Sequence, residues 1–277
     1  MGAREAMQPG GQLDLTVVVP YYNPGPNLAG HVAQVIELLR DRGVSFEVIA
    51  VSDGSTDGSD VGLADLGTEV QVVYLPVNQG KGHALRVGLG LGRGSYLGFI
   101  DGDGDIPAPV LGEFVSCIQN ERPDFAIGSK RHPESVVVYP RLRRLYSWGY
   151  QVLTRMLFGL NVTDTQSGIK LARREIVTEL LPILEEDGFT FDLELLAVAR
   201  RRGYTRVVEL PVEIRERFSS TVSPMAAWDM LVDTVRLTWR LRIAHRYDQA
   251  LAARRLAGQP PRPPEASRAD VPPQTTP

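Results

Sequence analysis

Short apolar runs alternate with amphipathic segments along the first hundred residues, and this alternation constrains the fold more than any other feature. The runs typical of buried strands are 15–20, 46–51, 70–75 and 96–100. Between them, 28–40 and 82–91 carry apolar residues at helical spacing. Because helices that alternate with strands connect parallel neighbours, we predict an α/β fold with a mostly parallel central sheet.

The second half of the chain predicts further strands and helices, followed by a Pro-rich end. We expect strands over 125–129 and 207–212, a loop over 161–170, and helices over 109–119, 142–157, 173–184, 191–202 and 223–245. The Pro, Ser and Thr content after Leu256 is typical of disorder. The predicted organisation is a flexible N-terminus over 1–13, one domain over 14–247 and a disordered Pro-rich tail over 248–277.

Composition excludes several classes of protein. Cys117 is the only cysteine, so the chain has no internal disulfide and no cysteine-based metal site, and we expect this residue to be buried. A net charge of -3 argues against nucleic-acid binding. No apolar run approaches the roughly 20 residues that span a bilayer, and the N-terminus carries no apolar signal core. We therefore expect a cytoplasmic protein, peripheral at the cytosolic membrane face.

Three carboxylates follow the fourth predicted strand, in the run Asp101-Gly-Asp103-Gly-Asp105. Their negative charges would repel one another at a strand end unless a cation lies there. Mg²⁺ and Mn²⁺ prefer oxygen ligands, and Mg²⁺ is commonly bound through one or two carboxylates together with substrate phosphates. A solvated Asp-Gly turn explains the pattern equally well at this point.

Six motifs, taken in order, resemble the family 2 glycosyltransferases. They are Val-Pro-Tyr-Tyr-Asn at 19–23, Ser-Asp-Gly-Ser-Thr-Asp-Gly-Ser at 52–59, Asn-Gln-Gly-Lys-Gly at 78–82, Asp-Gly-Asp at 101–103, Gly-Ser-Lys-Arg at 128–131 and Asp-Thr-Gln-Ser-Gly-Ile-Lys at 164–170. Within the family, the chain is most similar to polyprenyl-phosphate sugar synthases of the dolichyl-phosphate glucosyltransferase or mannose synthase type. The resemblance covers about residues 14–240 and implies a single Rossmann-like domain of the GT-A type.

On the donor side, the resemblance implies a site for a nucleoside diphosphate sugar and for Mg²⁺ or Mn²⁺. The nucleotide and diphosphate would meet Pro20, Tyr22, Asn23, Asp53, Lys81 and Asp101. The metal would be held by Asp101 and Asp103, with Asp105 as a further ligand. A turn at Asp53 and a solvated loop cation at Lys81 remain alternatives. Ser52 and Pro24 depart from the family pattern, which leaves the base open.

On the acceptor side, the resemblance implies a pocket for the phosphate of a polyprenyl lipid. Its predicted residues are Arg131, Arg143 and Ser147, with Gln166 and Ser167 in the acceptor loop, whereas Asp192 would contact the sugar. Arginine suits phosphate because its planar fork binds two oxygens at once. Arg217 matches a basic residue that the family places over the diphosphate. A solvated arginine face on the helix over 142–157 and a helix-end role for Asp192 are the alternatives.

Two segments mix apolar and aromatic residues with arginines, over 142–160 and 228–247. This pattern is typical of helices that lie at a membrane surface, although packing in a protein core explains it equally well. We predict peripheral membrane contact through one of them, and leave a membrane-protein partner or a homo-oligomer open.

The resemblance implies an inverting transfer of a hexose from GDP-mannose or UDP-glucose to a polyprenyl phosphate. Asp103, Arg217 and Asp164 are the predicted catalytic residues. A lipid phosphate is already an anion, so positioning and leaving-group electrostatics would suffice for catalysis. One alternative is a family 2 enzyme that uses a soluble or glycan hydroxyl acceptor, for which Asp164 would be the base. The other is a non-catalytic protein that binds sugar nucleotides.

Overall fold

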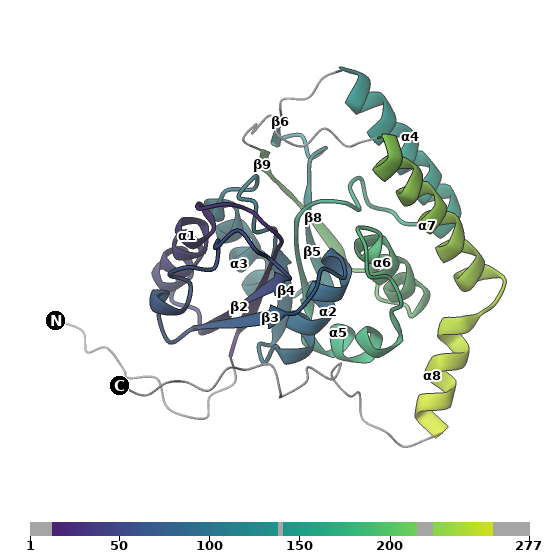
Figure 1. Ribbon diagram of the computed structural model, residues 1–277. Helices are drawn as coiled ribbons and strands as arrows, with labels where there is room; N and C mark the ends of the chain where they lie inside the picture. Colours follow the sequence, from purple (N-terminus) through teal and green to yellow (C-terminus); the bar gives the residue numbers. More distant parts are fainter. Residues whose placement is uncertain (1–12, 138–140, 215–223, 257–277) are drawn as a thin grey trace.

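A seven-stranded sheet forms the centre of the molecule in the computed structural model, which describes residues 13–137, 141–214 and 224–256 (Figure 1). Within these ranges, the side chains of 137, 141–148, 224–230 and 255–256 are left undescribed. The strands lie in the order β3-β2-β1-β4-β7-β5-β8. They are β1 (Leu15–Tyr21), β2 (Phe46–Asp53), β3 (Val70–Leu75), β4 (Tyr96–Ile100), β5 (Phe125–Ser129), β7 (Ile169–Arg173) and β8 (Val207–Pro211).

The sheet is parallel except at β7, which runs antiparallel to both β4 and β5. The predicted α/β class with a mostly parallel sheet is therefore confirmed. A short second sheet pairs β6 (Val136–Val137) with β9 (Glu213–Ile214).

Helices cover both faces of the central sheet, and two clusters of buried side chains separate the layers. Along β1, Val18 belongs to one cluster while Val17 and Val19 belong to the other, because successive strand residues point to opposite faces. Helices α1 (Leu28–Asp41) and α3 (Leu111–Asn120) pack on the second cluster. Cys117 of α3 is buried there as predicted, and burial raises the pKa of its thiol to about 11.

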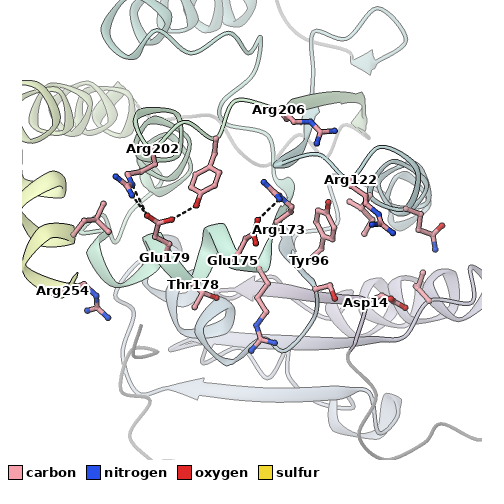
Figure 2. A pocket seen from close by; sticks show the side chains of 17 residues that line it. Asp14, Tyr96, Arg122, Arg173, Glu175, Thr178, Glu179, Arg202, Arg206 and Arg254 are labelled. Carbon is pink, nitrogen blue, oxygen red and sulfur yellow. Dashed lines mark hydrogen bonds and ion pairs between the residues drawn. The ribbon is translucent and has the colours of Figure 1, made fainter. Parts of the chain in front are cut away.

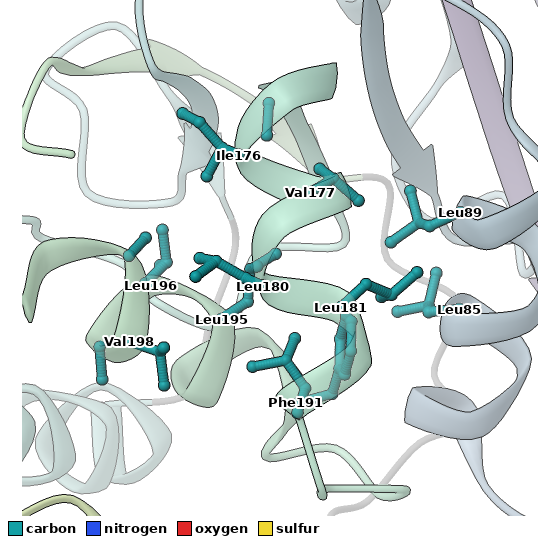
Figure 3. Close-up of a cluster of buried hydrophobic side chains, with 14 of the residues drawn as sticks. Leu85, Leu89, Ile176, Val177, Leu180, Leu181, Phe191, Leu195, Leu196 and Val198 are labelled. Carbon is teal, nitrogen blue, oxygen red and sulfur yellow. The ribbon is translucent and has the colours of Figure 1, made fainter. Parts of the chain in front are cut away.

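The other face of the sheet is covered by α2 (Lys81–Leu91), α5 (Arg174–Leu180) and α6 (Phe191–Arg201). Figure 3 shows Leu195 and Leu196 of α6 beside Leu180 of α5, and Leu85 and Leu89 of α2 on the side of α5 that carries Val177. Three further helices complete the described chain, α4 (Arg141–Phe158), α7 (Pro224–Arg242) and α8 (Arg246–Leu256).

Two sequence predictions need correction. Residues 169–173 form the central strand β7, where we expected the end of a loop and the start of a helix. The strand was missed because its charged residues, Lys170 and Arg173, interrupt the apolar run that marks a buried strand. The predicted domain boundary at 247 falls inside α8, whose Tyr247 and Leu251 pack in the core. Residues 257–277 of the predicted tail lie outside the described residues.

Candidate active site

The predicted donor residues lie at one edge of the central sheet, where the parallel strands end. Asp53 is the last residue of β2, Asp101 follows β4 and Lys130 follows β5. Because β7 is antiparallel to its neighbours, its second residue, Lys170, lies at this same edge. In open α/β sheets this is the edge at which ligands bind.

Lys81 and Asp101 form the closest ion pair at this edge. The Nζ of Lys81 lies 2.6 Å from the Oδ1 of Asp101, and both side chains are largely shielded from solvent. Burial disfavours the charged ammonium, but Asp101 and Asp192 outweigh this effect and hold the pKa of Lys81 above its usual value. The backbone N–H of Asp101 donates to the carbonyl of Gly168, whose missing side chain leaves room for the Asp101 carboxylate.

Asp192, at the start of α6, lies between two lysines. One carboxylate oxygen is 3.2 Å from the Nζ of Lys170, and the other is 3.8 Å from the Nζ of Lys81. The ring of Phe99 lies beneath both ammonium groups, each 5.3 Å from its centroid. Burial lowers the pKa of Lys170 in spite of the nearby Asp192 carboxylate. Two cations and two carboxylates, counting Asp101, therefore alternate across the floor of the site.

Asp103 lies in the turn that follows Asp101 and has an unusual proton affinity. Close packing of protein around its carboxyl and the charges of Asp101 and Asp105 raise the pKa of Asp103 to about 6, although the residue as a whole is exposed. Its Oδ1 accepts the backbone N–H of Asp105, which makes a tight turn. The turn interpretation and the repulsion between carboxylates that we predicted are thus both present.

This set of oxygen donors fits a divalent cation that also binds phosphate. Oδ1 of Asp101 is buried and has the Lys81 ammonium as its partner, and Asp103 is held beside it with a raised pKa. The described residues contain no group of three or more acidic, His or Cys side chains already placed to hold a metal ion, and the role of Asp105 as a further ligand stays a prediction. The Asp103 carboxylate accepts the backbone N–H of Asp105, and the Asp101 carboxylate pairs with Lys81, so both have partners within the protein.

Asp53 holds the loop that carries Lys81. Its carboxylate accepts the backbone N–H groups of Gln79 at 2.8 Å and Gly80 at 2.9 Å, and the residue is 3% exposed. The structure thus gives Asp53 a cross-loop role instead of the local turn considered from sequence. Its predicted contact with the nucleotide stays a prediction.

The remaining predicted donor residues lie beside Asp53, where the loops after β1 and β2 are joined by hydrogen bonds. Oδ1 of Asn23 accepts the N–H of Thr56 at 2.8 Å, and the N–H of Asn23 donates to Ser55. The carbonyl of Pro20 accepts the N–H of Gly102, and Tyr22 is 53% exposed. An exposed aromatic ring on braced loops is suited to stacking on a base.

Asp164 is enclosed by donors. It accepts the backbone N–H groups of Lys130 at 3.1 Å and Gln166 at 2.9 Å, and Lys130 Nζ lies 3.2 Å away. Burial by itself would raise the pKa of Asp164, but Lys130 and these N–H groups outweigh it and lower that pKa. Asp164 is therefore a weaker base than an ordinary carboxylate. Ser167, in the same loop, is fully buried, and its hydroxyl lacks a hydrogen-bond partner within the described residues.

The predicted acceptor residues are only partly described. The guanidinium of Arg131 donates to Gln151 of α4, and Arg143 and Ser147 stand two turns and one turn before Gln151 in the same helix. These positions share one helix face by spacing. The side chains of Arg143 and Ser147 are not described, and Arg217 lies outside the described residues.

Four residues at or beside this edge were not among the predicted site residues. Lys130, Lys170 and Phe99 contact the predicted acids or lysines, and the buried His31 lies beside the turn after Asp101. Burial lowers the pKa of His31. One signal was available for the cations, because the chain has three lysines and all of them lie here. No comparable signal exists for Phe99 or His31.

An apolar stripe runs over the outer face of α7 and the adjoining end of α4. Its exposed members are Val152, Met156, Leu231, Val235, Trp239 and Ile243. The two helices are joined by the hydrogen bond between Tyr150 and Thr234, and Leu237 of α7 packs inward against the core. No helix in the described ranges combines the length and the apolar character needed to cross a bilayer.

Comparisons with known proteins agree on one family and fold. Residues 16–181 match the family model described as Glycosyl transferase family 2. Dolichyl-phosphate beta-glucosyltransferase of Drosophila melanogaster is 30% identical over 244 residues, which cover 82% of this chain and 74% of that protein. The Homo sapiens protein of the same name is 30% identical over 260 residues, with 82% and 78% covered.

Solved structures show the same arrangement of the chain. Glucosyl-3-phosphoglycerate synthase from Mycobacterium tuberculosis, solved with phosphoglyceric acid, superposes with a TM-score of 0.64 at 20% identity over 84% of this chain and 86% of that one. The same protein has been solved with UDP and Mg²⁺, and with UDP, phosphoglyceric acid and Mn²⁺. The predicted single-domain GT-A fold is confirmed by this likeness.

Proposed function

Because the chain belongs to the family 2 glycosyltransferases, we propose that it transfers glucose from UDP-glucose to a polyprenyl phosphate of the dolichyl type with the help of a divalent cation. The relatives described above are named for glucosyl transfer to dolichyl phosphate, which favours glucose over the mannose that the sequence left open. A structural neighbour solved with UDP-glucose supports UDP as the carrier.

The observation that carries this proposal is the row of alternating charges at the strand ends, in the order Asp101, Lys81, Asp192, Lys170. Charges held in place before the substrate arrives need no reorganisation during the reaction. Lys81, released from Asp101, is suited to bind an oxygen of the departing diphosphate, and Lys170 keeps Asp192 in position. The glucose would then lie over Asp192 with its anomeric carbon open to the acceptor.

A divalent cation fits beside Asp101 and Asp103. These two residues would hold Mg²⁺ or Mn²⁺, which would neutralise the charge that develops on the diphosphate as it leaves. Asp101 would exchange its ion pair with Lys81 for the cation, so that Lys81 becomes available to the phosphates. Asp105 shapes the turn through its backbone N–H in this proposal.

The acceptor chemistry favours a phosphate over a hydroxyl. A hydroxyl acceptor needs a base, and the candidate for that role, Asp164, has a lowered pKa and donors on both oxygens. A phosphate monoester carries negative charge at neutral pH and attacks without one. Arg131, Arg143 and Ser147 remain our proposed partners of that phosphate, with Gln166 and Ser167 beside it and Arg217 over the diphosphate.

The apolar stripe on α4 and α7 supports peripheral contact with a membrane that contains the lipid acceptor. It begins on the same helix that carries Arg143 and Ser147, so a lipid tail would meet apolar surface close to its phosphate site. Arg155 and Arg242 are exposed beside the stripe, and such basic residues favour an anionic lipid surface. The cytosolic face remains the expected side.

A transfer assay tests the proposal. The protein is incubated with Mg²⁺ and labelled UDP-glucose or GDP-mannose, with polyprenyl phosphate, polyprenol or phosphoglyceric acid as acceptor. We expect label only in the lipid phosphate product from UDP-glucose, and loss of that product with EDTA or with Asp103→Asn. Transfer to polyprenol alone would support the hydroxyl acceptor, and transfer to phosphoglyceric acid alone would refute a lipid acceptor. Nucleotide binding without transfer to any acceptor would support the non-catalytic alternative.

A further inference from the structure

A wide groove lies at the opposite edge of the central sheet from the candidate active site. It has a volume of about 1410 Å³, and six of the 17 residues that line it are arginines, namely Arg122, Arg173, Arg174, Arg202, Arg206 and Arg254. Figure 2 shows it extending from α8, which carries Arg254, to the end of α3, where Arg122 lies. This concentration of arginine stands out in a chain whose net charge is -3.

The groove is separate from the site at the strand ends. Tyr96 at the start of β4 lines the groove, whereas Asp101 follows the other end of the same strand, and a strand of this length spans about 13 Å. Strand β7 likewise carries Lys170 near its first residue and Arg173 at its last. The two sites therefore share strands but lie at opposite ends of them.

The charges that line the groove do not cancel. Glu179 accepts two bonds from Arg202, and Glu175 lies 2.7 Å from Arg173, so these two acids are matched by two of the arginines. The remaining acid, Asp14, accepts hydrogen bonds from Ser45. Arg122, Arg174, Arg206 and Arg254 have no acid partner among the lining residues. Even with Asp14 and with the buried Asp124, which also pairs with Arg173, positive charge remains in excess and produces a positive field inside a concave surface.

Several guanidinium donors of these four arginines are free for a ligand. Arg174 and Arg206 each use one nitrogen on a backbone carbonyl, of Arg93 and Glu121. The guanidinium groups of Arg122 and Arg254 make no hydrogen bond or ion pair within the described ranges, and Nη2 of Arg254 is shielded from solvent as well. A shielded donor without a partner is unfavourable, so an acceptor placed there would be stabilising.

The size and position of the groove indicate which class of ligand it can bind. It exceeds the size of a single phosphate, and its arginines are spread between helices α3 and α8. A peptide that adds a strand pairs along a lateral edge strand, here β3 or β8, but the groove lies across the ends of strands, among them the inner strands β1, β4 and β7. Guanidinium forks bind phosphate oxygens in pairs without a metal ion.

We propose that this arginine groove is a second ligand site, for a small molecule that carries two or more phosphate groups. Binding would not require a divalent cation, unlike the diphosphate site at the other edge. The proposal does not depend on the transfer reaction, since it is tested by binding alone.

The test is calorimetric titration of the full chain with inorganic tripolyphosphate in the presence of EDTA. We expect saturable binding that weakens with added NaCl, and at least tenfold weaker binding of inorganic phosphate. The double variant Arg122→Gln/Arg254→Gln should weaken tripolyphosphate binding by about tenfold or more. The control Arg40→Gln/Arg236→Gln removes the same charge from ion-paired arginines elsewhere and should bind like the wild type.

Two further variants make the result decisive. Lys81→Gln should bind tripolyphosphate like the wild type, and a loss confined to this variant would place the ligand at the donor site and overturn the proposal. Arg254→Lys keeps the positive charge but lacks the planar guanidinium, so it should give intermediate binding. Because this change is conservative, it tests the site even if the double variant misfolds. Equal affinity in the wild type and in a folded Arg122→Gln/Arg254→Gln variant would also overturn the proposal.

Discussion

The hydroxyl of Tyr247 donates a 2.6 Å hydrogen bond to the buried carboxylate of Glu194, and so ties α8 to the wall of the candidate active site. The same carboxylate accepts the N–H groups of Glu185 and Glu186. The loop they begin packs against Gly80 and Gly82 on either side of Lys81. The helix through which the predicted domain boundary passes thus helps to support a predicted site residue.

Tyr247→Phe should lower the free energy of unfolding by about 1.5–3 kcal/mol, because it removes a hydrogen bond to a buried carboxylate. Urea denaturation followed by circular dichroism measures this change. Tyr22→Phe is the control, since Tyr22 is 53% exposed and its loss of a hydroxyl should change stability by less than about 0.5 kcal/mol. Similar values for the two variants would contradict the role given to Glu194.

Glu186 should make stability depend on pH. Burial, with the nearby charge of Glu194, raises the pKa of Glu186 to about 7 in spite of Arg240. A carboxyl whose pKa is higher in the folded state favours folding while it is protonated. Its contribution is therefore complete below the unfolded pKa of about 4.5 and is lost as the pH rises to about 7.

We therefore expect Glu186→Gln to gain stability relative to the wild type between pH 4.5 and 7, by about 3 kcal/mol at most. The loss of the Arg240 ion pair adds an offset to the difference in stability between the two proteins. The change of this difference with pH therefore reports the effect, and it is measured from unfolding curves of both proteins across this range. A difference between the proteins that stays constant with pH would refute the raised pKa.

Lys81→Gln should reduce glucosyl transfer by about 10²–10³-fold in kcat, since a fixed cation next to the leaving group acts mainly in the transition state. Steady-state kinetics with UDP-glucose measures it. The control is Arg40→Gln, which breaks an ion pair of similar length to Glu69 away from the site. If Lys81 acts only in binding, KM alone will rise and kcat will stay unchanged.

Gly168→Ala should displace Asp101, because the added methyl group would collide with the Asp101 carboxylate. We expect a large loss of transfer and a higher requirement for Mg²⁺, measured by titrating the metal in the transfer assay. Gly30→Ala makes the same change in α1, where nothing lies within 4 Å of the new methyl group. This control should keep its activity and gain up to about 1 kcal/mol of stability.

Val235→Glu should weaken binding to anionic lipid vesicles by about tenfold or more, because it puts a charge into the centre of the apolar stripe. Vesicle sedimentation measures the bound fraction. Val61→Glu is the matched control, since it places the same charge at another exposed valine that does not belong to the stripe. Equal binding by both variants would show that the apolar stripe is not the surface of the protein that binds the membrane.

The sequence predicted the architecture well for strands that are both apolar in sequence and buried in the structure. Strands such as β1 and β2 are fully buried, so their uniform apolar composition reveals them. Strand β7 was not predicted because it contains Lys170, a charged residue that is not expected in a buried strand. Asp192 of α6 neutralises this charge, and a contact between such distant segments is not visible in the local sequence pattern. Helix α8 was missed for a similar reason, since its low apolar content conceals the two residues that reach the core.

The candidate site was predicted as a set of residues but not as a set of contacts. Motif order predicted Asp53, Lys81, Asp101 and Asp192 as members of one site, and the structure brings these four residues together at the strand ends. Two of these contacts depend on loop geometry, which a single sequence does not specify. They are the ion pair between Lys81 and Asp101 and the hydrogen bonds from the backbone N–H groups of Gln79 and Gly80 to Asp53. The same limit applies to the pKa of Asp103, which depends on its surroundings.

The position of β7 has a consequence for synthesis of the chain. This strand is inserted between β4 and β5, yet residues 130–168 separate it in sequence from the later of these two neighbours. While the ribosome is still translating residues 130–168, the inner edges of β4 and β5 have no strand to pair with and are open to other chains. Early folding would therefore be limited to the half of the sheet formed by β1, β2, β3 and β4. A chain whose translation stops before residue 173 would expose the unpaired inner edges of β4 and β5, to which chaperones would bind.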